Sequence, residues 1–461
     1  MSDVSQPSSL GESWSTRFPI GWLTSPIGLT IFLAAATAFV FFSEHDIKIS
    51  KLDQFVADIE DQESWAAGGN KFRQIAFLAC AAIGSMSLLF GSTGKFRLNL
   101  PVVLIVFYIL WAGASVVWSI DSGTTMRRYI LVICCLIGCF GFSRFLRVQD
   151  VVGAAVLMPL AYLILGVGAE LLLGTFRPHV GEYRFAGTMH PNIQAANLAM
   201  GAIAAWVMAN VRPQAKLVFY GIFCLLFLFL ILTKCRSATG AVPVALGAIW
   251  LASQPTRNIL IGILASFWLF ASIGLICLVS GFDPITEYQE VLLLGRGEET
   301  GSSLTGRLPL WQELTKYVAA NPWRGYGFKS FWTPRHIYEI AVSQEWVISE
   351  AHSTYLDVTL QLGIFGLVLL TLTEFCTLLY AAYVFRVTQQ PAYLFLVGGI
   401  CFCVIRGLTE SGLGGASSIT AFLFLALASH SWKGNLLSST TERKLSDHSS
   451  QLTEHAESRI F

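Results

Sequence analysis

The sequence predicts an all-α integral membrane protein, and two observations lead to this prediction. First, 54% of the 461 residues are hydrophobic, only 13% are charged, and the mean hydropathy is +0.60. Soluble globular chains carry about 25% charged residues, so lipid must cover much of this surface. Second, apolar runs of membrane-helix length recur about twelve times, and no alternating barrel pattern appears. Because backbone groups in lipid must bond internally, a helical bundle is the expected class.

The charge balance and the cysteines exclude several function classes. The 30 Lys and Arg residues against 29 Asp and Glu residues leave a net charge of +1, which offers no electrostatic basis for binding nucleic acid. Most of the 10 cysteines lie inside apolar runs, as Cys134 and Cys135 do. Their spacing does not match a zinc site, so we expect them to be small core residues.

The apolar runs divide the chain into five predicted parts. These are a cytoplasmic N-terminal segment without a cleavable signal (1–26), spans one to nine (27–279, with an interfacial amphipathic segment at 43–73), an external loop domain (280–351), spans ten to twelve (352–432) and a disordered cytoplasmic tail (433–461). The expected spans are Ile27–Phe42, Ile75–Phe90, Leu100–Ile120, Tyr129–Phe142, Val151–Leu173, Ile193–Val211, Leu217–Leu232, Ala241–Leu251, Ile259–Val279, Leu356–Phe385, Tyr393–Ile405 and Ala416–Ala428. The eighth and eleventh runs are short for a full span.

The longest connection, Ser280–Ala351, is predicted to be a small domain. It contains a candidate amphipathic helix, Arg307–Ala320, which Asn321-Pro322 ends, and the glycine-punctuated aromatic stretch Trp323–Phe328 follows. Lys and Arg are nearly balanced between the two membrane faces, so the positive-inside rule does not decide the orientation. The aromatic loop and the Ser/Thr/Glu-rich tail favour a cytoplasmic tail and an external loop domain.

Four segments on the external face combine Arg or His with glycine or aromatic residues: Glu182–Asn192, Lys234–Gly240, Ser303–Arg307 and Glu350–Asp357. Several guanidinium groups near helix N-termini suit a diphosphate, because Arg presents a fork of donors and keeps its charge. His352 changes protonation near neutral pH and is able to accept a proton. The alternative is that each Arg reaches lipid head groups and that each His caps a helix.

At these residues the sequence resembles the bacterial O-antigen ligase and polysaccharide polymerase family. The similar stretches are Tyr183–Asn192, Arg236–Gly240, Thr305–Phe331 and His352–Gly366, in the same order and in the same relation to the spans. The strongest parts are Thr305-Gly306-Arg307 with Leu310-Trp311, Asn321-Pro322 through Gly325-Tyr326-Gly327-Phe328, and His352-Ser353-Thr354-Tyr355-Leu356 with Gln361-Leu362-Gly363 and Gly366. Each part is weak alone, and their ordered combination makes the resemblance specific.

The resemblance implies a GT-C-like glycosyltransferase of the bacterial inner (cytoplasmic) membrane, with its active site facing the periplasm. It implies an inverting transfer of a glycan from undecaprenyl diphosphate, without a metal, a nucleotide sugar or another cofactor. The acceptor is another lipid-linked repeat unit in polymerases and lipid A-core in ligases. The implied partners are the lipid-linked donor, this acceptor and the bilayer, together with other polysaccharide assembly and export proteins.

The same resemblance implies roles for single residues. Arg184 and Arg236 would hold the diphosphate, and Arg307 would join them or orient the glycan. His352 would be the catalytic histidine at the acceptor hydroxyl. Cys235 precedes Arg236 where Ser is common in the family, so the match at this second site is looser.

Other residues of the external face are assigned less narrowly. Arg406 and Glu410 are either a third arginine site with its orienting carboxylate or a charge pair at a helix end. His190 and Tyr355 are possible orienting residues, and His190 and His336 are rivals for the role of base. Ionisable residues in or near apolar spans are functional hypotheses by default, and these are Glu170, Asp357 and Glu374.

Two other readings of the function belong to different classes. A twelve-span transporter predicts two similar halves of six spans, whereas here the long loop follows span nine. A flippase of lipid-linked glycans would bind diphosphate without needing an acid/base residue. Within the family that the sequence resembles, the Arg406–Ser411 element and a Trp-rich loop favour an exopolysaccharide polymerase over an O-antigen ligase. The tryptophans of this loop are Trp311, Trp323, Trp332 and Trp346.

Overall fold

The computed structural model describes residues 71–90, 96–181, 183–255, 303–344, 348–412 and 417–432, with isolated positions at 257, 258, 261, 268, 272 and 415. Within these residues the fold is all-helical, as predicted, and no β-strand occurs. The predicted spans at 27–42 and 259–279 and the interfacial segment at 43–73 lie wholly or almost wholly outside the described residues, as does the tail. The count of twelve spans therefore stays a prediction.

Every other predicted span coincides with a helix. The elements are α4 (Lys71–Phe90), α5 (Leu100–Ala114), η3 (Ser115–Val117), α6 (Ser122–Ser143), α7 (Val148–Leu172), α8 (Pro191–Val211), η4 (Pro213–Ala215), α9 (Lys216–Leu232), α10 (Arg236–Ser253), α15 (Ser303–Ala320), α16 (Pro334–Gln344), α17 (Thr354–Thr388), η5 (Pro391–Tyr393) and α18 (Leu394–Gly407), and a last apolar helix covers Ser418–Trp432. Six segments of the described chain are long and apolar enough to cross a membrane: Leu100–Val117, Ser122–Ser143, Val148–Leu172, Pro191–Val211, Pro213–Leu232 and Thr354–Thr388. The chain is therefore a multi-pass membrane protein.

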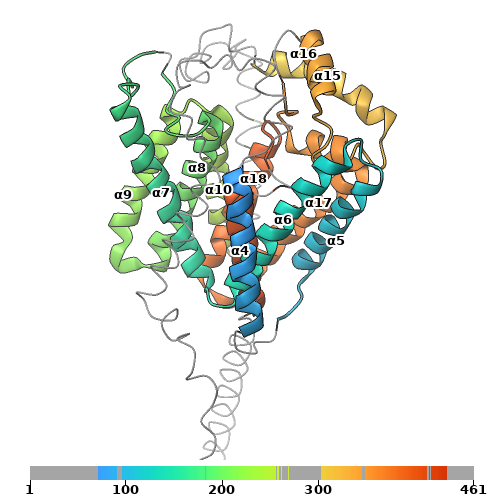
Figure 1. Ribbon diagram of the computed structural model, residues 1–461. Helices are drawn as coiled ribbons and strands as arrows, with labels where there is room; N and C mark the ends of the chain where they lie inside the picture. Colours follow the sequence, from blue (N-terminus) through green and yellow to red (C-terminus); the bar gives the residue numbers. More distant parts are fainter. Residues whose placement is uncertain are drawn as a thin grey trace, which may run out of the picture.

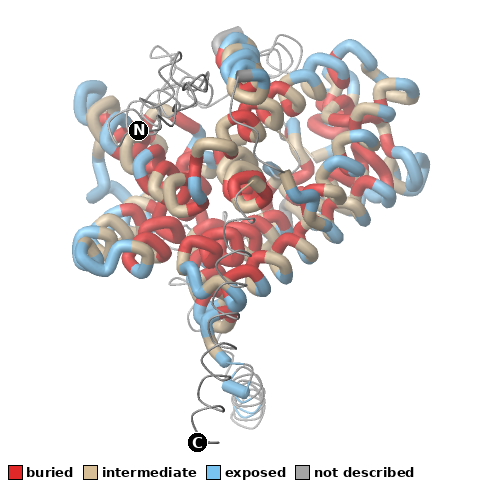
Figure 2. Tube along the Cα trace, turned by 90° about the horizontal axis from the view of Figure 1, so that it is seen from below, coloured by how far each residue is buried: buried red, intermediate tan, exposed pale blue. Residues whose placement is uncertain are grey.

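Burial separates the central helices from the peripheral ones. Of the 18 most apolar consecutive residues of α8, 83% are buried. In the segment Pro213–Leu232, which contains α9, the corresponding share is only 11%. The apolar side chains of α9, such as Leu217, instead project outward among the described residues, an arrangement that suits a surface facing lipid. Small residues let neighbouring helices approach α8 closely, as Ala195 and Ala199 do. Figure 2 shows the buried residues gathered in the middle of the bundle.

Capping side chains explain where several helices begin. Asn99 accepts a hydrogen bond from the Val102 amide (3.0 Å) at α5, and Asp121 accepts one from the Thr124 amide (2.9 Å) at α6. Such caps satisfy amides that the first turn leaves without partners. Because of Asp121, α6 begins well before the apolar run that predicted this span.

Helix α17 is broken where the sequence predicted one continuous span. Gly363 has φ +67° and ψ −168° inside it, a conformation that favours glycine. A Cβ atom there would lie 2.2 Å from the Trp323 carbonyl carbon, so the connection after α15 packs against the break. The backbone amides of Tyr326 and Gly327 bind the carbonyls of Leu360 and Gln361, each at 2.8 Å, which replaces bonds lost at the kink. 

The helices α15 and α16 form a small unit at one end of the bundle (Figure 1). Helix α15 ends before Asn321 as predicted, but it begins earlier, at Ser303. The unit has its own buried cluster, which includes Leu314, Phe331 and Ile337. His336 stacks on Phe331 and its Nδ1 lies 2.7 Å from the Phe331 carbonyl oxygen. This rival for the catalytic base therefore belongs to the packing of the unit.

Candidate functional site

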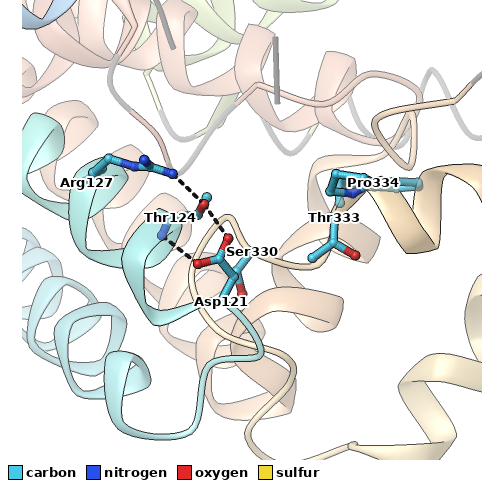
Figure 3. Close-up of a pocket in the computed structure, with 7 residues that line it drawn as sticks. Asp121, Thr124, Arg127, Ser330, Thr333 and Pro334 are labelled. Carbon is cyan, nitrogen blue, oxygen red and sulfur yellow. Dashed lines mark hydrogen bonds between the residues drawn. The ribbon is translucent and has the colours of Figure 1, made fainter. Parts of the chain in front are cut away.

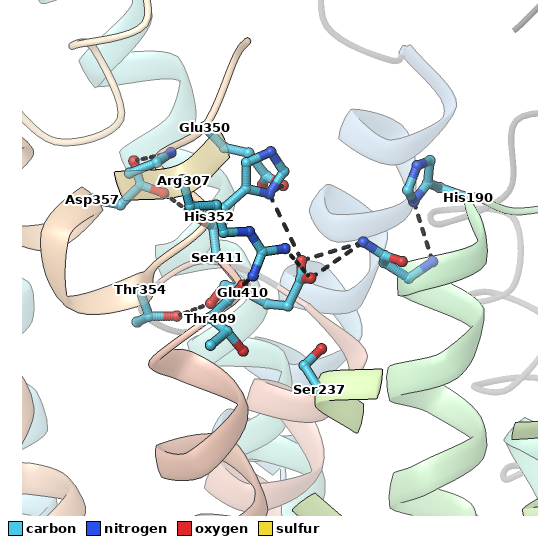
Figure 4. A network of polar contacts seen from close by, with 12 residues as sticks. His190, Ser237, Arg307, Glu350, His352, Thr354, Asp357, Thr409, Glu410 and Ser411 are labelled. Carbon is cyan, nitrogen blue, oxygen red and sulfur yellow. Dashed lines mark hydrogen bonds and ion pairs between the residues drawn. The ribbon is translucent and has the colours of Figure 1, made fainter. Parts of the chain in front are cut away.

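The segments singled out in the sequence converge on one end of the bundle, beneath α15 and α16. The N-termini of α8, α10 and α17 meet the C-terminus of α18 there, and α15 supplies Arg307 (Figures 1 and 4). Figure 4 shows their polar side chains pointing toward one another around Glu410. Residues far apart in the chain thus form one polar cluster.

The carboxylate of Glu410 is the centre of this cluster. It accepts a hydrogen bond from Arg307 Nη2 at 3.0 Å. Both of its oxygens also accept longer hydrogen bonds from Asn192 Nδ2, at 3.4 Å. Arg307 Nη1 also donates to the carbonyl of Thr409 at 2.6 Å, and Thr354 Oγ1 donates to the carbonyl of Glu410 at 2.9 Å. The Glu410 side chain is only 5% exposed, so the ion pair with Arg307 is shielded from solvent and held from both sides.

His352 lies beside the same carboxylate. Its Nδ1 is 3.2 Å from Glu350 Oε1 and 3.9 Å from Glu410 Oε2. The backbone of His352 has φ +49°, a left-handed conformation whose strain is worth about 1–3 kcal/mol. Such strain persists only where the surrounding structure imposes it. The side chain is therefore held at the start of α17 in a fixed place relative to Glu410.

The charges of the cluster perturb each other's protonation. Burial by itself disfavours ionised Glu410, but the contact with His352 and the positive charges of Arg406 and Arg307 outweigh it and lower the pKa of Glu410 to about 2. Burial likewise disfavours protonated His352, but Glu350 and Glu410 outweigh it and raise the pKa of His352 to about 9. At neutral pH the cluster therefore holds a carboxylate against an imidazolium.

Arg184 reaches the cluster through Asn192. Its Nη2 donates to Asn192 Oδ1 at 2.9 Å and its Nε donates to the Thr233 carbonyl at 3.0 Å. Asn192 in turn approaches Glu410, so one side chain connects the first predicted arginine segment with the cluster centre. Thr233 directly precedes the segment Lys234–Gly240 that contains Arg236, so this bond ties the two segments together.

Glu170 anchors the loop that presents Arg184. This residue of α7 is 3% exposed, and its Oε1 accepts the amides of Ala186 at 3.1 Å and Gly187 at 2.8 Å. Its Oε2 accepts the hydroxyl of Tyr183. A buried carboxylate of this kind needs such donors, and here they fix the backbone on both sides of Arg184.

Arg406 borders the cluster, and Arg236 begins a helix whose N-terminal end lies beside it (Figure 1). Arg406, in the last turn of α18, donates from Nη2 to the Asn192 carbonyl at 3.5 Å, and its buried Nε has no hydrogen-bond partner among the described residues. Arg236 is half-buried at the start of α10, and Figure 4 draws the side chain of its neighbour Ser237 in the same view as the cluster. The salt-bridge partner of Glu410 is thus Arg307 of α15, whereas Arg406 acts on Glu410 through its charge.

Asp357 connects the two chain segments that carry His352 and Glu410. Its Oδ1 accepts the Ala351 amide at 3.3 Å and the indole N–H of Trp332 at 2.8 Å, and its Oδ2 accepts the hydroxyl of Ser411. Ala351 precedes His352 and Ser411 follows Glu410. One buried carboxylate therefore fixes the spacing between the two ionised groups.

Two predicted orienting residues lie apart from the cluster centre. His190 is the N-cap of α8, where its Nδ1 accepts the Asn192 amide at 3.2 Å. Burial and the charge of Arg184 lower the pKa of His190, so it stays neutral. The hydroxyl of Tyr355 binds Glu374 Oε2 at 3.1 Å and the Val404 carbonyl at 3.3 Å. The hydroxyl of Tyr355 thus points toward Glu374 within the span. His190 caps α8, which is the alternative role that the sequence allowed for each histidine.

The side chains of Glu350, His352 and Glu410 are also of the types that bind metal ions, and their ligand atoms lie within 4.8 Å of one another. A metal ion at this place would compete with groups that are already there. Arg307 already holds one oxygen of Glu410, and an ion would have to displace the proton of His352, whose pKa is about 9. The guanidinium and the imidazolium supply the positive charge that these carboxylates need.

Sequence reasoning missed several residues of the cluster. Glu350 and Asn192 lie at the bounds of two of the segments singled out in the sequence, but neither was given a role there. Polar residues next to a predicted site are the signal that points to them, as with Thr409 beside Glu410. Their partners come from other helices, so only the packing reveals the contacts.

Comparisons with known proteins agree with the family resemblance. Residues 221–371 match the family model described as O-antigen ligase. The chain is also similar to the exopolysaccharide production protein ExoQ of Rhizobium meliloti (strain 1021), with 26% identity over 337 aligned residues; the match covers 64% of this chain and 71% of that protein. The matched segment contains Arg236, Arg307 and His352, whereas Arg184 and Glu410 lie on either side of it.

Proposed function

Because the chain belongs to the O-antigen ligase and polysaccharide polymerase family, we propose that it is a membrane glycosyltransferase that moves a glycan from undecaprenyl diphosphate to a sugar hydroxyl. The observation that supports this most is the convergence of Arg307, His352 and Glu410 with Arg184 and Arg406 at one end of the bundle. Arginines in a shielded place suit an anionic leaving group, and a histidine beside carboxylates suits proton transfer.

The proposed topology follows the sequence. Twelve spans of a GT-C-like enzyme cross the bacterial inner membrane, spans one to nine within 27–279 and spans ten to twelve within 352–432. Residues 280–351 form a periplasmic loop domain. The ends of the chain, 1–26 and 433–461, are cytoplasmic.

Donor binding is assigned to the arginines. Arg184, Arg236 and Arg406 hold the diphosphate, and Arg307 joins them from the loop domain. The buried Nε of Arg406, which lacks a partner among the described residues, has a donor available for a phosphate oxygen. Fixed cations stabilise charge that grows as the diphosphate leaves, and loss of one such donor typically costs about 3–4 kcal/mol.

His352 is the proposed base. Glu350 and Glu410 lie at its Nδ1, which leaves Nε2 for the acceptor hydroxyl, as in other carboxylate–histidine pairs. The hydroxyl oxygen forms a bond to the anomeric carbon from the face opposite the diphosphate, the bond to the phosphate oxygen breaks, and the proton passes to Nε2 of the neutral imidazole, the form of His352 whose share grows as the pH approaches 9. The configuration is inverted, and base catalysis contributes about 100- to 10,000-fold.

The acceptor of a polymerase is another lipid-linked repeat unit, and this is the reaction we favour. The name of the similar protein refers to exopolysaccharide production, and the aromatic loop points the same way. Transfer to lipid A-core, as in an O-antigen ligase, is the alternative. A flippase would have no use for a strained histidine between carboxylates.

Glycan analysis of a deletion strain tests the proposal. The strain is complemented with wild type, with His352→Ala and with the exposed control Arg335→Gln on α16. Wild type and the control restore long polymer, whereas His352→Ala leaves single repeat units. Long lipid-linked polymer that never reaches lipid A would instead identify a ligase, and unchanged glycans in the deletion strain would refute transfer altogether.

A chelator distinguishes the proposed metal-free mechanism from one in which the cluster holds a metal ion. Arg307 and the proton of His352 compete with any ion at Glu410. Transfer by the purified protein in nanodiscs should therefore be unchanged by EDTA. A loss that Mg²⁺ or Mn²⁺ restores would show that the cluster holds a metal during the reaction.

A further inference from the structure

A cavity with charged and hydroxyl groups in its lining lies between the start of α6 and the connection that joins α15 to α16. Its volume is about 170 Å³, and it is lined by Asp121, Thr124, Arg127, Ser330, Trp332, Thr333 and Pro334. Figure 3 shows these side chains on two facing segments. None of them belongs to the cluster around Glu410, so the cavity is a separate place in the fold.

Its lining combines opposite charges with hydroxyl groups. Asp121 Oδ2 accepts the hydroxyl of Thr124 at 2.6 Å, and Arg127 Nη2 donates to that hydroxyl oxygen at 2.9 Å. The hydrogen bonds from Thr124 lower the pKa of Asp121, so a carboxylate faces the cavity at neutral pH. Ser330 and Thr333 add hydroxyls from the opposite segment, and the indole of Trp332 adds an aromatic wall.

This set of groups selects among ligand classes. A carboxylate beside the cavity repels phosphate, and the charged lining disfavours a lipid chain. Vicinal hydroxyls pair well with a carboxylate and a guanidinium, and the apolar face of a sugar ring packs on an aromatic ring. The volume is below the roughly 300–1,000 Å³ of sites for drug-sized ligands, which suits one monosaccharide.

The cavity is physically connected to the polar cluster. The indole N–H of Trp332 binds Asp357 Oδ1 at 2.8 Å, and Asp357 holds the residues next to His352 and Glu410. A ligand that presses on the Trp332 wall therefore acts one hydrogen bond away from the residue that positions both ionised groups.

We propose that this cavity is a carbohydrate subsite that binds one sugar residue of the glycan at a distance from the bond being formed. The assignment of that sugar to the enzyme's own glycan rests on the proposed transferase function. The subsite gives the enzyme a means of selecting its repeat unit. Only a glycan whose sugar presents hydroxyls to Asp121 and Arg127 is held so that its reacting end reaches the cluster around Glu410.

The test uses two variants that preserve the fold. Asp121→Asn keeps a good N-cap for α6 while removing the charge, and Arg127→Gln changes an exposed side chain. Arg335→Gln, another exposed arginine of the same region, is the control. The full-length proteins in nanodiscs are probed by saturation-transfer NMR with an oligosaccharide released by partial hydrolysis of the host polysaccharide, and then assayed for transfer.

We expect both variants to bind the oligosaccharide about tenfold or more weakly than wild type and the control, with a higher KM for the lipid-linked glycan and a similar kcat. Binding and KM equal to wild type in both variants would overturn the subsite. If wild type binds the oligosaccharide and the variants do not, while no protein transfers glycan, the subsite stands and the transferase proposal fails.

Discussion

The pairing of Glu410 with His352 makes a quantitative prediction for Glu410→Gln. The two nearby carboxylates raise the pKa of His352 from 6.5 to about 9, which corresponds to about 3 kcal/mol in favour of the imidazolium. Removing one of the two charges should take away on the order of half of this. Glutamine keeps the size of the side chain and an oxygen for Arg307, so the fold is retained.

The assay is the pH dependence of transfer by the purified protein between pH 6 and pH 10. If His352 is the base, the wild-type rate rises with pH and levels off near pH 9, where the imidazolium loses its proton. In Glu410→Gln the inflection moves to a pH about one unit lower, and the plateau falls because a weaker base remains. The control is Glu339→Gln, an exposed carboxylate paired with Arg335.

Two results would refute this reasoning. An unchanged inflection in Glu410→Gln would show that the carboxylate does not set the proton affinity of His352. A wild-type rate that falls as the pH approaches 9 would show that the imidazolium is the active form. In that case His352 would stabilise the leaving group, and the proton acceptor would be another residue.

The same pair also affects stability. The raised pKa of His352 contributes stability that is fully present below pH 6.5 and is lost as the pH rises through about 9. The lowered pKa of Glu410 contributes stability that is present above pH 4.5 and is lost as the pH falls to about 2. The stability difference between wild type and Glu410→Gln, measured by thermal unfolding, should therefore be largest between these limits, at pH 4.5–6.5.

Further predictions concern the elements that position the cluster. Gly363→Ala places a Cβ 2.2 Å from a Trp323 backbone atom and should prevent stable folding, judged by yield and thermal unfolding; in Gly153→Ala, which meets nothing within 4 Å, stability should be retained. Equal stability of the two variants would contradict the kink. Glu170→Gln, which leaves one of the three donors to this carboxylate badly placed, should lower stability by about 1–3 kcal/mol and raise the KM for the lipid-linked donor through Arg184. A KM equal to that of wild type would show that the loop does not need this anchor.

The membrane helices were predictable because hydropathy is a local property. Each apolar run must satisfy its own backbone in lipid, so a helix follows from the run itself, as at α7 and α8. The stop at Asn321 was equally local, since Pro322 cannot continue a helix. The boundaries of α6 were harder, because its polar first turn is stabilised by a cap rather than by an apolar run.

The sequence alone determined the class of the protein and the segments that carry chemistry: Arg184, Arg307 and His352 stand out as charged or titratable residues at the ends of apolar runs. The tertiary structure alone decided their partners. Arg307 pairs with Glu410, 103 residues along the chain, and Asp357 binds the residues next to His352 and Glu410. Such contacts depend on how the helices pack, and the packing sums many weak contacts between distant segments that no local pattern records.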